Sequence, residues 1–201
     1  MRRILDRYVV EIVERFDLCP WAKSARLGGE VAIDVLWGEP SMEAWLEAGK
    51  AMLAQPGARI AMVVAPESAL TVAELREVRD HVTRNVPQTG IAHFHPDAPL
   101  DLATPARLVP FLRRSPDPLL QLVPLALLES VRGAPMPVER AQQVQMLGGV
   151  GPMVRGDIAD RIAEVNHARV SAEQAEVMRV LETIAQDRRA SYARVGVHSA
   201  R

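Results

Sequence analysis

Between residues 31 and 95, strand-like and helix-like segments alternate, and this order limits the possible folds more than any other feature of the 201-residue chain. The strand-like segments are short and rich in Val and Ile, whereas the helix-like segments follow capping residues, Ser41 and Thr71. Parallel strands need crossover connections, which helices of this length supply. We therefore expect an α/β fold with a β-α-β-α-β core and a small, mostly parallel sheet flanked by helices. The expected strands are residues 31–37, 60–64 and 91–95, and the expected helices are 41–54 and 71–86.

The segments on either side of this core are mainly helical in pattern. Apolar residues at steps of four predict an amphipathic N-terminal helix: Ile4, Tyr8, Ile12 and Phe16. Residues 96–124 contain seven prolines, which exclude a long regular element and favour a stiff loop. Further helices are expected at residues 119–131, kinked or shortened at Pro124, and at residues 138–147.

Two more helical patterns, at residues 157–168 and 171–189, predict a C-terminal helical hairpin. Ser171 and Gln174 have capping-box spacing for its second helix. The hairpin would cover the core of its own chain, pair with a second subunit in a homodimer, or close over a site. We expect packing on its own core, because amphipathic helices usually serve that purpose. The chain is therefore divided into an α/β core domain, residues 1–149, and a helical extension, residues 150–201.

Composition excludes several classes of partner. The hydrophobic fraction of 48% and the charged fraction of 24% are those of an ordinary globular protein. A formal net charge of -1 gives no overall field that attracts nucleic acid or an anionic membrane. The longest apolar stretch, residues 119–128, is too short to span a bilayer. One cysteine excludes an intrachain disulfide, and charges interrupt any export signal, so we expect a cytoplasmic protein without nucleic-acid or membrane partners.

Cys19 is the single cysteine, and Pro20 follows it. Proline is favoured at the first position of a helix, so this order predicts Cys19 at an N-cap. The helix dipole there would stabilise a thiolate, the form that attacks substrates and ligates metals or haem iron. The alternative is a small, buried and inert cysteine.

His93 and His95 are two residues apart at the end of the third expected strand, so they would share one face of the sheet. Ligands of α/β proteins bind beyond the carboxyl ends of parallel strands, where this pair would lie. The imidazoles would ligate a metal, transfer protons or hold a nearby cysteine as thiolate. The alternative is a strand-end histidine bonded to backbone or water.

Arg113, Arg114 and Ser115 lie in the proline-rich loop. A rigid loop would fix a guanidinium group in position to bind a carboxylate or phosphate, and Ser115 adds a hydroxyl to the same loop. The alternative is a solvated basic turn. The sequence contains no His-Glu-x-x-His, paired-cysteine zinc or Gly-x-Ser-x-Gly motif, so zinc proteases, zinc fingers and serine hydrolases lose support.

The short segments around Cys19, His95 and Arg114 together resemble the motifs of an uncharacterised bacterial family. Its members carry Leu-Cys-Pro-Phe-Ala-Lys, Phe-His-Pro and Asn-Arg-Ser-Pro-Tyr-Pro, which match the sequence around Cys19, His95 and Arg114. The resemblance covers roughly residues 3–149 and implies that these three residues belong to one site. This chain resembles a divergent member of that family, because Arg113 replaces its asparagine, Asp117 its tyrosine and Gln121 the histidine that it often has.

The leading hypothesis is a small-molecule enzyme with a Cys/His/Arg site. Within it we favour a haem-dependent oxidoreductase that acts on a small carboxylate-bearing metabolite, with Cys19 and His95 at the iron and Arg113, Arg114 and Ser115 at the propionates or substrate. Two enzymatic alternatives are a metal-free cysteine nucleophile with His93 or His95 as base, and a non-haem metal site at the two histidines. A non-catalytic binding or interaction module is the alternative from another class.

Overall fold

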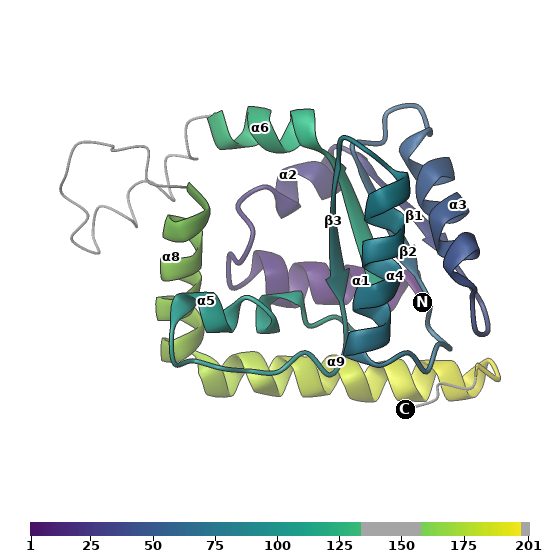
Figure 1. Cartoon of the computed structure of the whole chain (residues 1–201). Coiled ribbons are helices and arrows are strands. Elements are labelled where there is room, and N and C mark those ends of the chain that lie inside the picture. Colours follow the sequence, from purple (N-terminus) through teal and green to yellow (C-terminus); the bar gives the residue numbers. More distant parts are fainter. Residues whose placement is uncertain (134–157, 198–201) are drawn as a thin grey trace.

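The computed structural model describes residues 1–133 and 158–197, and within these ranges the chain forms a four-stranded sheet between two layers of helices (Figure 1). Helices α3 (Met42–Leu53) and α4 (Val72–Asn85) connect the first three strands. The α/β class and the β-α-β-α-β order expected from the sequence are confirmed. The strands are β1 (Val31–Val35), β2 (Ile60–Val64), β3 (Thr89–Phe94) and β4 (Leu119–Pro124), and their order in the sheet is β1-β2-β4-β3.

Among these four strands, three run in the same direction and β4 runs against them. β1 pairs in parallel with β2, whereas β4 lies between β2 and β3 and is antiparallel to both. The prediction of a helix over residues 119–131 was wrong in its first half, because α6 (Leu125–Gly133) begins only after Pro124. A short apolar run fits a strand or a helix equally well, and the strands that pair with it are distant in sequence.

The helices between the strands begin where their capping residues predict. The Ser41 hydroxyl accepts a hydrogen bond from the Ala44 amide at 3.2 Å before α3. Before α4, the Glu74 amide donates to the Thr71 hydroxyl at 3.2 Å, and the Thr71 amide donates to the Glu74 carboxylate at 2.8 Å. These local contacts satisfy amides that the first helical turn leaves unpaired, which explains why the sequence predicts both helices correctly.

The two faces of the sheet pack against different helices. Ala61 and Val63 of β2, with Leu120 of β4, belong to a buried cluster that contains residues of α3 and α4. Val64 and Leu119 point the other way, into a cluster that contains residues of α1 (Arg2–Tyr8) and α9 (Gln174–Arg194). Alternate side chains of a strand leave opposite faces, so the strands at the centre of the sheet are buried on both sides.

The N-terminal helix has the predicted buried face, but it changes geometry along its length. After α1, a π-helical segment, η1 (Val9–Glu14), continues the helix. Its wider turns are visible in the hydrogen bond from the Leu18 amide to the Val13 carbonyl, 2.8 Å long, which spans five residues. Ile12 and Phe16 remain buried in the same cluster as Tyr8.

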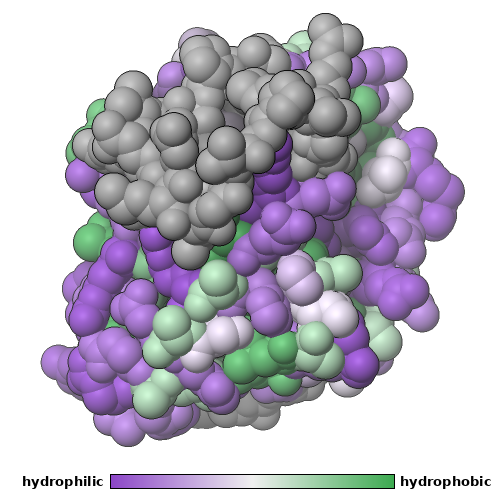
Figure 2. All heavy atoms as spheres, turned by 90° about the vertical axis from the view of Figure 1, so that its left-hand side faces the viewer, coloured by the Kyte–Doolittle hydropathy of each residue, from purple (hydrophilic) through white to green (hydrophobic). Residues whose placement is uncertain are grey.

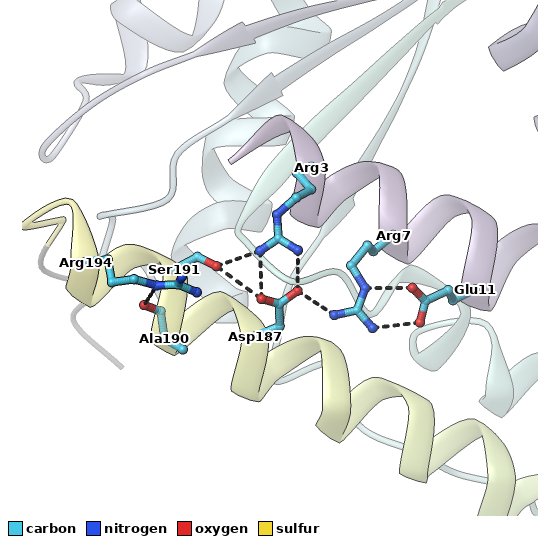
Figure 3. A network of polar contacts seen from close by, with 7 residues as sticks. All are labelled: Arg3, Arg7, Glu11, Asp187, Ala190, Ser191 and Arg194. Carbon is cyan, nitrogen blue, oxygen red and sulfur yellow. Dashed lines mark hydrogen bonds and ion pairs between the residues drawn. The ribbon is translucent and has the colours of Figure 1, made fainter.

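The C-terminal hairpin consists of α8 (Ile158–Ala172) and α9, and α9 packs on the core of its own chain as expected. Ion pairs join α9 to the N-terminal helix: Asp187 accepts hydrogen bonds from Arg3 at 2.7 Å and from Arg7 (Figure 3). The predicted capping box at Ser171 was wrong, because Ser171 lies within α8 and α9 follows Glu173, which makes no side-chain cap bond. The expected helix at 138–147 and the division at residue 149 lie outside the described residues.

The face that carries α8 is mostly hydrophilic where the structure describes it, with apolar side chains gathered in a small area (Figure 2). Although α9 has 21 residues, neither it nor any other described helix is apolar enough over a sufficient length to cross a membrane. A homodimer through the C-terminal helices stays a prediction.

Candidate functional site

A cavity of about 250 Å³ lies where loops at one edge of the sheet meet α9. The loops are those that follow β2 and β3, and the one between η2 (Phe111–Arg113) and β4. Since β2 and β3 run in the same direction, the cavity lies beyond their carboxyl ends, where ligands of α/β proteins bind. Its polar lining residues include His95, Asp97, Arg114, Glu182, Arg188 and Arg189.

Three of the six residues singled out from the sequence line this cavity. His95, Arg114 and Ser115 come together there. Two of the three segments that resemble the family motifs, those around His95 and Arg114, therefore line one cavity. Cys19, His93 and Arg113 are not among its lining residues.

His95 is 1% exposed, and both of its ring nitrogens bond to the backbone. The Asp97 amide donates a hydrogen bond to Nδ1 at 3.1 Å, so the ring proton lies on Nε2, which donates to the Leu70 carbonyl at 2.8 Å. The His95 amide also donates to the Arg113 carbonyl at 3.0 Å. His95 therefore links its own loop to the backbone at Leu70 and at Arg113. This arrangement matches the alternative of a strand-end histidine bonded to backbone.

A buried ion pair fixes the proline-rich loop to α9. The Asp117 carboxylate accepts hydrogen bonds from Arg188 Nε at 2.6 Å and from the Tyr192 hydroxyl at 2.7 Å. The Ser115 hydroxyl donates to the Asp117 carbonyl at 2.6 Å, and Arg188 also donates to the Pro66 carbonyl at 3.0 Å. Burial raises the pKa of Asp117, although Arg188 and Tyr192 oppose that change.

Arg188 is a residue of the cavity that was not predicted from the sequence, although its spacing in α9 indicates a buried position. Val177, Leu181, Ile184 and Arg188 follow the spacing of one helical face. An arginine on an apolar stripe must meet an acidic partner when the stripe is buried. Asp117, which departs from the family-like motif, is that partner.

Arg114 is the cation of the cavity that has no ion pair among the described residues. Arg188 is paired with Asp117, and Arg189 donates to Glu182 at 2.9 Å. The Arg189 bond is also the main reason why the pKa of Glu182 is lowered, with a smaller contribution from Arg114. Arg114 is half-buried and, within residues 1–133 and 158–197, its guanidinium makes no hydrogen bond or ion pair.

Cys19 lies elsewhere, in a turn between η1 and α2 (Ala22–Leu27). The N-cap prediction was wrong, because the residue before α2 is Trp21; Pro20 lies in the turn and the Cys19 carbonyl accepts a 3.3 Å hydrogen bond from the Ala22 amide. The thiol is free of disulfide and half-buried. It lies near Tyr8, whose pKa is raised first by burial and then by Cys19.

His93 and Arg113 lie on the α4 side of the sheet. Burial and the positive charges of Arg79, Arg113 and Arg76 lower the pKa of His93 to about 4. Of the predicted pair, His93 lies opposite Leu120 on the α4 side of the sheet, and only His95, just after the end of β3, reaches the cavity.

The cavity residues do not fit haem ligation as they are arranged. Both ring nitrogens of His95 are bonded to the backbone, and Cys19 is not part of the lining. Among the described residues, no group of three or more His, Cys, Asp or Glu side chains is arranged to hold a metal ion. Haem binding by this chain stays a prediction.

Compared with known proteins, the chain matches no family model, no curated protein and no solved structure. The resemblance to the bacterial family therefore stays a prediction, carried by His95 and Arg114 at one cavity and by Cys19 outside it.

Proposed function

We propose that the cavity beside α9 binds a small metabolite through the metabolite's carboxylate, with Arg114 as the binding residue. The observation that carries this proposal is the ion pairing of the cavity: Arg188 and Arg189 have carboxylate partners, and Arg114 has none among the described residues.

A half-buried guanidinium that has no ion pair or hydrogen bond has lost part of its hydration without a direct polar contact in return. A carboxylate restores that loss, because its two oxygens match the two parallel N–H donors of a guanidinium. The ligand would complete at Arg114 the kind of contact that Asp117 makes with Arg188.

The size and the walls of the cavity favour a small ligand with an apolar part. Its volume of about 250 Å³ is below the range typical of drug-sized ligands. Met178, Leu181 and Ile184 of α9 supply one apolar wall, and prolines of the loops supply another. A metabolite of a few carbon atoms with one or two carboxylates fits these features.

The lining offers binding groups more clearly than reactive ones. The Ser115 hydroxyl donates to Asp117, and the ring nitrogens of His95 bond to the backbone. The proposal is therefore a binding function, and an enzymatic step at Cys19, by haem or by a thiolate, stays a prediction.

Titration calorimetry at low ionic strength with lactate, succinate and 2-oxoglutarate, and with succinamide as the uncharged match for succinate, tests this proposal. Arg114→Gln should weaken binding of the best carboxylate by about tenfold or more, because a charge-assisted hydrogen bond contributes about 1.5–3 kcal/mol. Arg107→Gln is the matched control, since Arg107 pairs with Asp101 outside the cavity. Equal binding by wild type and Arg114→Gln, or binding of succinamide as tight as succinate, would overturn the proposal.

A further inference from the structure

The side chain of His93 points from β3 toward α4. His93 lies opposite Leu120 of β4, and residues directly opposite each other in antiparallel strands share one face of the sheet. Leu120 packs in the cluster that contains Leu75 and Val78 of α4. Within that layer, His93 Nδ1 is buried and has no hydrogen-bond partner among the described residues.

Three arginines share this region with His93. Arg76 and Arg79 lie on α4, Arg113 ends η2, and the positive charge of each lowers the pKa of His93. Asp80 is the carboxylate that acts on His93 from the same side, and it lies 2.7 Å from Arg79 Nε. Among the described residues, Arg79 is the one of these three arginines that has a carboxylate partner, so two positive charges, those of Arg76 and Arg113, are left over.

Arg113 carries one of these unpaired positive charges in a partly buried position. It is half-buried, and both burial and the nearby Arg79 lower its pKa. In the part of the chain that the structure describes, its guanidinium has no hydrogen bond or ion pair. Like charges gathered in a partly desolvated place repel each other, and an anion between them converts that repulsion into attraction.

We propose that Arg79, Arg113 and His93, with Arg76 at the solvent side, form a second anion site that takes a phosphoryl group. A phosphate monoester carries close to two negative charges at pH 7, which match the two positive charges left over. Its oxygens accept hydrogen bonds from guanidinium groups, and neutral His93 can carry its proton on Nδ1 and donate to one of them.

This site differs from the carboxylate site at Arg114, and the proposal goes beyond that function. Arg113 and Arg114 are neighbours in the chain, but Arg114 lines the cavity beside α9 whereas Arg113 interacts with Arg79 of α4.

Calorimetry of the full chain with inorganic phosphate and with phenyl phosphate, against sodium chloride at the same ionic strength, measures this binding. Arg113→Gln and Arg79→Gln should each weaken phosphate binding about tenfold or more. Arg84→Gln removes the same charge from an exposed position near the end of α4 and should change the affinity less than twofold. Similar affinities in Arg113→Gln, Arg79→Gln and Arg84→Gln, or no heat from phosphate in the wild type, overturn the proposal.

The imidazole proton signals of the five histidines give a second readout by NMR. Phosphate should raise the pKa of His93 from about 4, because a nearby anion favours the protonated ring. His93→Gln assigns the signal. Arg114→Gln should leave both the calorimetric and the NMR result unchanged. Loss of phosphate binding in Arg114→Gln but not in Arg113→Gln would place the anion in the cavity and refute the second site alone.

Discussion

Replacing Arg188 by methionine removes the positive charge that faces the buried carboxylate of Asp117. The two side chains are 9% and 3% exposed and are joined by a 2.6 Å hydrogen bond. Removing one partner of a buried pair typically costs about 3–5 kcal/mol, because the remaining charge is left desolvated. We expect about 3 kcal/mol for Arg188→Met, at the low end of that range, since the Tyr192 hydroxyl still donates to the carboxylate.

This cost should depend on pH, and the direction follows from Asp117. Burial already raises its pKa in the folded chain, and Arg188 is the main group that opposes the rise. Without Arg188 the folded-state pKa lies further above the unfolded one, so the folded variant takes up a proton first as the pH falls. The contribution of a protonated Asp117 is present at low pH and is lost as the pH rises through the folded-state pKa. Arg188→Met should therefore be most destabilising at pH 7 and less so at pH 4.5.

Urea denaturation followed by circular dichroism measures both values. Arg189→Met is the matched control, because Arg189 and its partner Glu182 are 54% and 58% exposed and such surface pairs contribute at most about 1 kcal/mol. A cost below about 1 kcal/mol for Arg188→Met at pH 7 would refute the reasoning, and so would equal costs at the two pH values.

Four further predictions concern other parts of the chain. Thr71→Ala should lower the free energy of unfolding by about 1 kcal/mol in urea, because the capping box before α4 is lost; an unchanged midpoint contradicts this. Arg3 and Arg7 hold the pKa of Asp187 below its usual range, so Asp187→Asn should lower the melting temperature at pH 7 and by less at pH 3, where the carboxylate contribution is being lost. Haem ligation through Cys19 predicts a Soret band with added haemin that disappears in Cys19→Ser, and a band unaffected by that substitution contradicts it. Succinate in the cavity should slow amide exchange in α9, since ligand binding stabilises the docked helix; unchanged α9 exchange at saturation contradicts the cavity site.

The sequence predicts elements well where their cause is local. The capping residues Ser41 and Thr71 begin their helices as expected, and the apolar spacing of the N-terminal segment gives the buried face of α1. β4 was missed because its apolar run is stable as a strand only through pairing with β2 and β3, whose residues are at least 25 positions away.

The same distinction applies to the candidate site. The prediction placed His95 at a strand end, and the strand direction then puts it beside a cavity. The N-cap at Cys19 failed because Pro20 suits a turn as well as the first position of a helix, and the π-helical segment before it leads into a turn. Nothing local to Arg113 or Arg114 shows which of them meets α4 and which meets α9.

The cavity exists only because α9 lies against the loops of the sheet. Its lining comes from chain segments near residues 68, 95 and 115 and from α9, and the Arg188–Asp117 pair joins the last two. Asp117 is also one of the positions at which this chain departs from the motifs of the family that it resembles. Because the Asp117 carboxylate pairs with Arg188, the position of the helix that encloses the cavity and that of the loop that carries Arg114 depend on each other. The ligand preference of the proposed site should depend on that ion pair, because α9 supplies the apolar wall that a ligand bound to Arg114 would contact.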